Sequence, residues 1–227
     1  MVPERKPGTK TKRAVFVIDD HPIVREGLTQ LINREPDLVV CGHAEYAYEA
    51  VKSVELVKPD VAIADISLKG TDGIELIKNL KTRAPALAVL VLSIHDESLY
   101  AARALRAGAR GYIMKQEATE NVLIALRRVL NGEIYLSERM SNKMLQQFVG
   151  LSSTATGFSI DRLSDRELEV FRLIGEGHGT RRIAEELRLS IKTVESYREH
   201  IKDKMTLSDA NELVQHAVHW VQQEKVR

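Results

Sequence analysis

Four short apolar runs in the first half of the sequence each end in a side chain that could take part in phosphate or metal chemistry. The runs cover residues 14–18, 61–64, 89–92 and 112–114, and they are followed in turn by Asp19 and Asp20, Asp65, Ser93, and Lys115. If the runs are neighbouring parallel strands, their polar ends meet at the carboxyl edge of one sheet, where open α/β sheets bind ligands. The spacing therefore predicts a single site.

The side chains of this predicted site have complementary chemistry. Asp19, Asp20 and Asp65 offer hard oxygen ligands, which Mg²⁺ prefers together with water and phosphate. Asp65 could also attack phosphorus, with the cation offsetting repulsion between its carboxylate and the incoming phosphoryl oxygens. Ser93 and Lys115 supply a hydroxyl group and a positive charge for those oxygens. Taken singly, each residue could be a helix cap or a solvated side chain, so the prediction depends on their combination.

The segments that must position these residues alternate between strand and helix patterns from residue 14 to residue 130. The helix-like segments carry apolar side chains at spacings of three and four, as in Val24, Leu28, Leu31 and Ile32. The runs 61–64 and 89–92 are continuously apolar, which is expected of strands that helices cover on both faces. With residues 37–41 as the fifth strand, the pattern predicts an α/β fold with a doubly wound parallel (βα)5 sheet.

Composition limits the class of protein but does not name a partner. The chain has 227 residues, 29% of them charged, and a formal net charge of +1, so total charge does not argue for nucleic acid. No apolar run is long enough for a secretory signal or a membrane span, which predicts a cytoplasmic protein without membrane contact. We predict a flexible basic tail at 1–13, an α/β domain at 14–131, a helix and linker at 132–157, and an all-helical domain at 158–227.

The last part of the chain has helix patterns only. Ser164 and Glu167 have the spacing of a capping box at the start of a helix. Residues 180–199 have the spacing of a helix, a tight turn and a second helix. If this segment binds DNA, the outer face of the second helix enters the major groove. That face carries Glu195, Ser196, Arg198, Glu199 and Lys202.

The first half resembles the receiver domain of response regulators. The matching segments are VFVIDD at 15–20, PDVAIAD at 59–65, TDGIE at 71–75, VLS at 91–93 and GARGYIMK at 108–115. The resemblance covers residues 14 to about 130 and implies a flavodoxin-like fold. It implies that a histidine kinase phosphorylates Asp65, that Ser93 and Lys115 sense the phosphoryl group, and that Tyr112 is an aromatic switch. Packing in the core would also explain Tyr112.

The same resemblance implies a Mg²⁺ site formed by Asp19, Asp20, Asp65 and the backbone carbonyl of Ser67. Haloacid-dehalogenase-like phosphatases also use an aspartyl nucleophile in a parallel sheet. They require a second Asp two residues after the first, where this chain has Ser67. The sequence therefore favours a phosphoacceptor, which could catalyse its own phosphoryl transfer and dephosphorylation, over an enzyme that acts on other substrates.

The second half resembles the LuxR-type domain of the NarL/FixJ class, from about residue 158 to residue 221. The resemblance rests on LSDRELEV at 163–170, on Ile183 and Ala184, on KTV at 192–194, on Ile201, and on Lys204 and Met205. It implies a transcription factor that binds double-stranded DNA and dimerises when active. Phosphate contacts would come from Lys192, Thr193 and Lys202, with Glu195, Ser196 and Glu199 nearest the bases. The last helix would serve dimerisation through Leu213, Ala217 and Trp220, although its apolar stripe also suits the domain core. Trp220 is either the anchor of the dimer contact or a partly exposed core residue.

The charge of this half leaves an alternative open. Residues 158–227 contain twelve Lys and Arg and thirteen Asp and Glu, so this half has no net positive charge. Positive side chains that release counterions from phosphates supply most nucleic-acid affinity, so this charge balance does not favour strong DNA binding. Glu195 and Glu199 could accept hydrogen bonds from cytosine, or they could simply solubilise the helix. The alternative is a phospho-regulated signalling adaptor whose C-terminal helices bind protein. If the segment binds DNA, we expect weak binding by a monomer.

Overall fold

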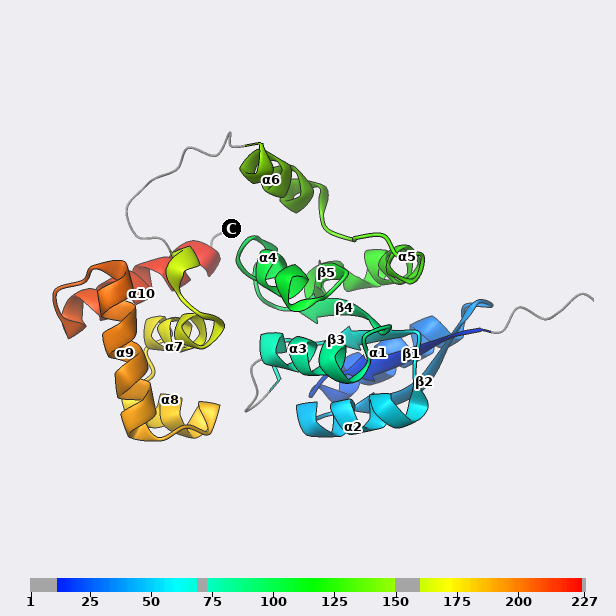
Figure 1. The fold of residues 1–227 in the computed structure, drawn as a ribbon, viewed down its shortest axis with the longest axis horizontal. Helices are drawn as coiled ribbons and strands as arrows, with labels where there is room; N and C mark the ends of the chain where they lie inside the picture. Colours follow the sequence, from blue (N-terminus) through cyan, green and yellow to red (C-terminus); the bar gives the residue numbers. More distant parts are fainter. Residues whose placement is uncertain (1–11, 69–72, 150–159, 226–227) are drawn as a thin grey trace, which may run out of the picture. The chain divides into compact units, whose positions relative to one another are not determined.

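The computed structural model describes residues 12–68, 73–149 and 160–225. The chain divides into two compact units, which we call the sheet unit, ending at Ser137, and the helical unit, beginning at Glu138. All five strands belong to the sheet unit (Figure 1). Among the described residues, no helix is long and apolar enough to cross a membrane.

The sheet is fully parallel, with the strand order β2-β1-β3-β4-β5. This order confirms the predicted doubly wound fold. Because the order reverses between β1 and β3, the ligand crevice of such a sheet lies at the carboxyl ends of these two strands. The strands are β1 (Arg13–Ile18), β2 (Leu38–Ala44), β3 (Val61–Ala64), β4 (Ala88–Ser93) and β5 (Gly111–Met114).

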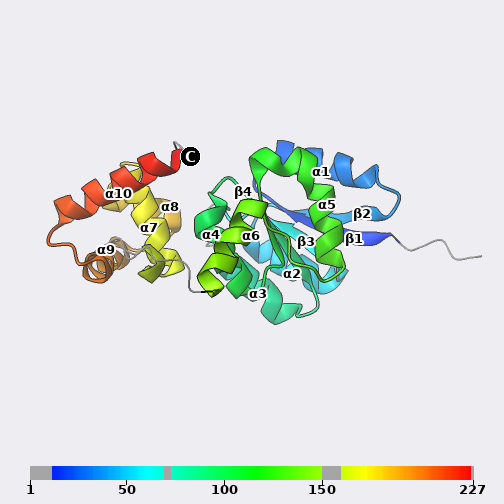
Figure 2. The same cartoon turned by 90° about the horizontal axis from the view of Figure 1, so that it is seen from above.

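Helices cover both faces of the sheet, as the continuously apolar strands predict. Figure 2 shows α1 and α5 on one side of the strands, with α2 and α3 on the other. Every residue of β3 and β4 is buried as a result. The helices are α1 (Pro22–Asn33), α2 (Ala47–Val57), α3 (Gly73–Arg83), α4 (Glu97–Ala107) and α5 (Ala118–Leu130), with a short 3-10 turn η1 (Lys115–Glu117) before α5.

The core beneath α1 and α5 shows how the strand pattern selects a face. Val15 and Val17 of β1 point to the same side, where they join Leu28 of α1 and Leu126 of α5 in one buried cluster. The intervening Phe16 is also buried, on the other side of the sheet. Apolar residues on both sides of each strand therefore hold the strand ends, and the polar residues that follow them, in place.

The sheet unit is longer at both ends than the sequence pattern predicts. β1 begins at Arg13, whose backbone N–H donates to Asp37 O at 2.8 Å, so this residue is not part of a flexible tail. After α5, Tyr135 pairs in parallel with Gly111, and Tyr112 N donates to Tyr135 O at 2.9 Å. The chain beyond residue 131 thus covers the edge of β5. We call residues 132–137 the edge strap.

The helical unit contains short helices, and one of them begins at the capping box that the sequence predicts. Ser164 and Glu167 form the capping box at the start of α7. Gly175 ends α7 against the last helix, where a Cβ atom would lie 2.3 Å from Ala217 O. The helices are α6 (Glu138–Phe148), α7 (Asp165–Gly175), α8 (Thr180–Leu187), α9 (Ile191–Met205) and α10 (Ala210–Lys225), with a 3-10 turn η2 (Ile160–Arg162). The predicted linker residues 150–157 and tail residues 1–11 lie outside the described residues.

Candidate functional site

Three carboxylates meet at the carboxyl ends of β1 and β3. Asp19 and Asp20 follow β1, and Asp65 follows β3, with exposed fractions of 1%, 8% and 0%. Ligand atoms of these three residues and of His21 all lie within 4.8 Å of one another. Oxygen-rich clusters of this kind suit a hard divalent cation. The acidic cluster is therefore consistent with a metal site.

Lys115 joins two of the carboxylates from the end of β5. Its Nζ atom lies 2.8 Å from Asp19 Oδ2 and 2.7 Å from Asp65 Oδ2. Burial alone would lower the pKa of Lys115, but the hydrogen bonds to Asp19 and Asp65 outweigh it and raise the pKa. Burial raises the pKa of Asp65, and the bond from Lys115 offsets only part of that effect. The lysine therefore stays positively charged inside the acidic cluster.

Two hydroxyl groups lie beside Asp65. The backbone N–H of Ser67 donates to Asp65 Oδ1 at 2.7 Å, which fixes one carboxylate oxygen. The side-chain oxygens of Ser67 and Ser93 lie 3.4 Å apart. Ser93, the last residue of β4, is fully buried. The sheet thus brings Asp65, Ser93 and Lys115 together from β3, β4 and β5.

A chain of hydrogen bonds leads from Ser93 to the edge of the sheet. His95 N donates to Ser93 Oγ at 3.0 Å, and the Tyr112 hydroxyl donates to His95 O at 2.9 Å. Tyr112 is 1% exposed, and burial raises its pKa well above the ordinary value. Its backbone N–H in turn binds Tyr135 of the edge strap. Tyr112 therefore packs in the core and also connects the site to the strap.

The structure adds residues that the sequence pattern did not single out. His21 Nδ1 lies 2.8 Å from Asp20 Oδ1, and Arg25 donates to the backbone oxygen of Asp19 at 2.6 Å. The position of His21 directly after two acidic residues was the available signal. Glu97 of α4 accepts hydrogen bonds from Ser137 N at 2.9 Å and from the Ser137 hydroxyl. No local pattern predicts this contact, because the two residues are 40 positions apart.

In the helical unit, α8 and α9 form the predicted helix-turn-helix. Arg188 adopts a left-handed conformation at φ 55° after α8, and Ser190 caps α9 by accepting from Thr193 N at 3.0 Å. Ile183 and Val194 are fully buried and hold the two helices together. The turn between the helices is therefore short and well packed.

The predicted DNA-contacting residues of α9 differ in exposure. Lys192, Glu195, Ser196 and Glu199 are exposed, whereas Thr193, Arg198 and Lys202 are half-buried. Lys202 Nζ also lies 2.8 Å from Glu199 Oε2. This ion pair reduces the charge that either side chain can offer to DNA.

The residues predicted to form a dimer contact lie inside the helical unit. Leu213 and Ala217 are fully buried, and Trp220 packs its ring 5.6 Å from that of Phe171 in α7. The apolar stripe of α10 is thus used by its own domain, because α7 covers it. In this form, Leu213 and Ala217 offer no surface to a second copy.

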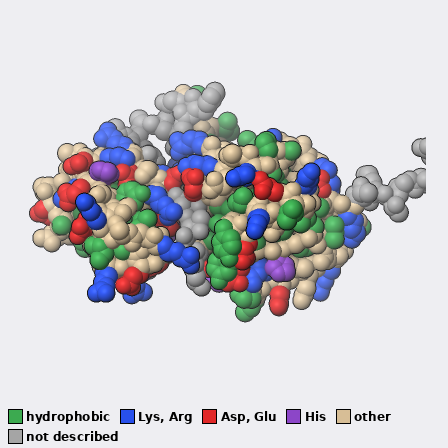
Figure 3. Space-filling view, turned by 60° about the horizontal axis from the view of Figure 1, so that its bottom comes forward, with side chains coloured by type: hydrophobic (Ala, Val, Ile, Leu, Met, Phe, Trp, Pro, Cys, Tyr) green, Lys and Arg blue, Asp and Glu red, His purple; other side chains and the backbone are tan. Residues whose placement is uncertain are grey.

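Surface charge is mixed. On the face shown in Figure 3, Lys and Arg side chains are interspersed with Asp and Glu. This agrees with the near balance of acidic and basic residues in the sequence. Among the described residues drawn on this face, Lys and Arg do not gather into one large basic surface.

Comparisons with known proteins agree with the two units. Residues 15–127 match the family described as response regulator receiver domain, and residues 161–217 match the family described as bacterial regulatory proteins, luxR family. The oxygen regulatory protein NreC of Staphylococcus aureus (strain JH9) is 36% identical over 208 residues, which cover 90% of this chain and 96% of NreC.

Two solved structures show the same similarity. RcsB from Salmonella enterica serovar Typhimurium, bound to promoter rprA with the phosphomimetic BeF3-, has a TM-score of 0.65 and 27% identity, covering 92% of this chain and 99% of RcsB. A structure of two RcsB dimers bound to two parallel DNAs has a TM-score of 0.56 and 28% identity, covering 90% of this chain and 97% of that chain.

The receiver match, the luxR-family match and the similarity to NreC along nearly the whole chain together show the family. Its members are transcription factors rather than enzymes, which sets the adaptor alternative aside. The chain belongs to the NarL/FixJ class of two-component response regulators, in which a receiver domain is joined to a LuxR-type DNA-binding domain.

Proposed function

We propose that Asp65 is the phosphoacceptor through which a sensor histidine kinase controls this transcription factor. The observation that carries the proposal is the convergence of Asp65, Asp19 and Lys115, with Lys115 Nζ 2.7 Å from Asp65 Oδ2. A carboxylate accepts a phosphoryl group only if the negative charge around it is compensated. Lys115 supplies one compensating charge within the site.

Mg²⁺ supplies the remaining compensation when it is bound, by neutralising charge on the carboxylates and on the phosphoryl oxygens. Asp19, Asp20 and Asp65 would hold it together with the backbone carbonyl of Ser67. The buried carboxylate set supports this assignment, since Mg²⁺ favours a few carboxylates with water and phosphate oxygens. Lys115 would then turn toward the phosphoryl group while remaining in the site.

Phosphorylation would act on the receiver by electrostatics. A phosphoryl group adds roughly −1.5 to −2 charges. Ser93 and Lys115 would bind its oxygens, and movement of Ser93 would pass through His95 to Tyr112. Such a change shifts an existing equilibrium between two arrangements. The hydrogen bonds from Ser93 to Tyr112 and on to Tyr135 support Tyr112 as the switch residue.

The helical domain would bind double-stranded DNA through α9, as a homodimer when active. RcsB has been solved on promoter DNA and as dimers bound to DNA, which supports this proposal. Lys192, Thr193 and Lys202 would contact phosphates. Glu195, Ser196 and Glu199 would lie closest to the bases, with Arg198 on the same DNA-binding face. Among the predicted dimer residues of α10, only Trp220 retains exposed surface for a contact.

The receiver domain would run from Arg13 to the end of the edge strap at Ser137, one residue earlier and six residues later than the predicted 14–131. The DNA-binding domain would cover 158–227, with a helix and linker at 138–157 and a basic tail at 1–12. The family matches at 15–127 and 161–217 fall inside these limits. We also propose that the protein works in the cytoplasm, where both DNA and the kinase domain of a sensor are available.

Phosphoryl transfer from acetyl phosphate in the presence of Mg²⁺ tests the proposal directly. We expect ³²P incorporation into the full chain and none into Asp65→Asn, because an amide oxygen is a poor nucleophile. Asp37→Asn is the matched control. Asp37 comes directly before β2, at the amino end of the strands and away from Asp65, and it pairs with Arg127. Persistent label in Asp65→Asn would show that another residue accepts the phosphoryl group.

A further inference from the structure

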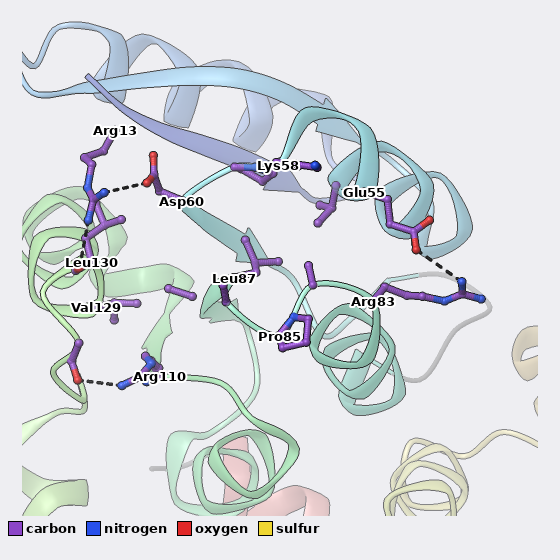
Figure 4. Close-up of a pocket in the computed structure, with 16 residues that line it drawn as sticks. Arg13, Glu55, Lys58, Asp60, Arg83, Pro85, Leu87, Arg110, Val129 and Leu130 are labelled. Carbon is purple, nitrogen blue, oxygen red and sulfur yellow. Dashed lines mark hydrogen bonds and ion pairs between the residues drawn. The ribbon is translucent and has the colours of Figure 1, made fainter. Parts of the chain in front are cut away.

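A cavity lies at the amino edge of the sheet, at the opposite end of the strands from Asp65. It has a volume of about 670 Å³, within the range of small-molecule sites. Its walls come from the starts of β1 and β4, the ends of α2, α3 and α5, and the loops beside them (Figure 4). None of the proposed phosphorylation residues lines it.

The inner wall of this amino-edge cavity is apolar and firmly held. Leu87 and Val129 are 3% and 1% exposed, so the hydrophobic surface belongs to the core. Lys81 fixes the loop on one side, because its Nζ atom donates to Pro85 O at 2.6 Å and to Leu87 O at 2.7 Å. An apolar body would therefore meet a preformed surface.

The rim of the cavity is positively charged. Two of its cations have carboxylate partners in the cavity: Arg13 lies 2.8 Å from Asp60, and Arg83 lies 3.5 Å from Glu55. The charged residues that line the cavity are Arg13, Lys58, Arg83 and Arg110, against Glu55 and Asp60. Two positive charges therefore remain unbalanced at this site.

Lys58 and Arg110 carry the unbalanced charge. Lys58 lies at the end of α2 with a left-handed backbone, φ 50°, and its ammonium group pairs with no side chain in the described part of the chain. Arg110 Nη1 donates to Gly132 O at 2.8 Å, which orients the guanidinium and leaves its other N–H groups for a ligand. Figure 4 shows Lys58 and Arg110 on opposite sides of Leu87.

We propose that the amino-edge cavity binds a small organic dianion with an apolar body. The body would lie over the buried Leu87 and Val129 and against the more exposed apolar residues Pro85, Ala86 and Leu130. The two acidic groups would point toward Lys58 and Arg110. Charge-assisted hydrogen bonds from lysine and arginine are the strong contacts in such a site. The site would give the receiver a ligand input separate from Asp65.

Amide chemical shifts of the ¹⁵N-labelled full chain test this proposal with 2,6-naphthalenedicarboxylate as the probe. We expect saturable shifts at Leu87, Ala88 and Gly132, which line the cavity. The neutral probe 2-naphthamide has the same aromatic body and should bind at least about fivefold more weakly, because it carries no negative charge to pair with Lys58 and Arg110. Absence of shifts at these three residues, or equal binding of both probes, would overturn the proposal.

Charge-removing variants test the two cations. Lys58→Gln and Arg110→Gln should each weaken binding of the dicarboxylate by about fivefold or more. Lys52→Gln on α2 is the matched control, since Lys52 is an exposed lysine that does not line the cavity. Lys58→Gln removes no side-chain contact within the described structure, so this variant should fold normally. Its affinity can therefore be interpreted even if Arg110→Gln disturbs folding. Unchanged affinity in Lys58→Gln and Arg110→Gln would place the probe elsewhere.

Discussion

Tyr112 shows how one residue can serve both the core and the switch. Its ring is buried, while its hydroxyl group donates to His95 O at 2.9 Å. Removing the ring would leave a cavity and disturb folding, so a large truncation cannot separate the two roles. Removing only the hydroxyl group leaves the packing in place.

We therefore predict a specific defect for Tyr112→Phe. The free energy of unfolding should fall by only about 1 kcal/mol, the usual net value of one hydrogen bond. The gain in DNA affinity on phosphorylation should shrink, because the link from Ser93 through His95 is broken. Fluorescence anisotropy with and without acetyl phosphate measures this gain, and Tyr48→Phe, with its 70% exposed ring, is the control. A full gain in Tyr112→Phe would leave Tyr112 a packing residue only.

At the scale of elements, the edge strap connects the sheet with the chain that follows it. Tyr135 pairs with β5, and Glu97 of α4 binds both the backbone and the hydroxyl group of Ser137. A buried carboxylate that accepts two hydrogen bonds holds its partner firmly. The strap is thus attached to β5, which contains Tyr112, and to the start of α4.

We predict that Glu97→Gln loosens the edge strap. The neutral amide makes weaker hydrogen bonds than the carboxylate, so amide hydrogen exchange across residues 133–137 should rise by roughly tenfold, equivalent to about 1.4 kcal/mol. Exchange mass spectrometry of the full chain measures the rate. Glu26→Gln on the exposed side of α1 is the control. Equal rates in Glu97→Gln and the unmodified chain would show that β5 pairing alone holds the strap.

The start of α7 carries a pH-dependent contribution to stability. Burial acts to raise the pKa of Glu167, but bonds from Lys204 and Ser164 outweigh it and hold the pKa below its usual 4.5. A carboxyl group whose pKa is lowered by folding stabilises the fold at pH values above its ordinary pKa. That stability is lost as the pH falls through the lowered value. Glu167 thus links α7 to α9 through Lys204 near neutral pH.

We predict that Glu167→Gln lowers the free energy of unfolding of the helical domain by about 1–2 kcal/mol at pH 7. The difference from the unmodified chain should shrink as the pH falls below 4.5. Urea unfolding followed by fluorescence of Trp220, the only tryptophan, reports on this domain. Glu185→Gln, with a side chain that is 71% exposed, is the control. A difference that stays constant with pH would rule out the lowered pKa as its source.

For the whole molecule, the near-zero charge of residues 158–227 means that a single copy has little electrostatic affinity for DNA. Two copies bound together double the phosphate contacts without any new residue. We predict that acetyl phosphate and Mg²⁺ raise the affinity for promoter duplex and the fraction of dimer together. Anisotropy measures the affinity, and sedimentation velocity measures the fraction of dimer. Tight binding by a phosphorylated monomer would contradict this prediction.

Lys192 tests the DNA face separately. Because Lys192 is exposed on α9, Lys192→Gln should lower the slope of log affinity against log salt by about 1 per subunit. Lys52→Gln in the receiver should leave the slope unchanged. If Lys192→Gln has the same slope as the unmodified chain, α9 does not approach the phosphates at this residue.

The residue pattern alone was enough to predict the fold class and the members of the acidic site. Strand-length apolar runs followed by Asp19 with Asp20, Asp65, Ser93 and Lys115 leave few ways to arrange a parallel sheet, because strand ends share one edge. The capping box of α7 was also predictable, since it depends on residues three positions apart.

The faces that are buried and the distant residues that meet could be seen only in the folded chain. Leu213 and Ala217 have an apolar spacing that suits either a core or a dimer, and α7 covers them. Glu97 meets Ser137, and Lys58 and Arg110 line one cavity, through contacts between residues far apart in the chain. Local patterns record the period of a helix or strand. They do not record which neighbour covers a face, because that depends on the packing of the whole domain.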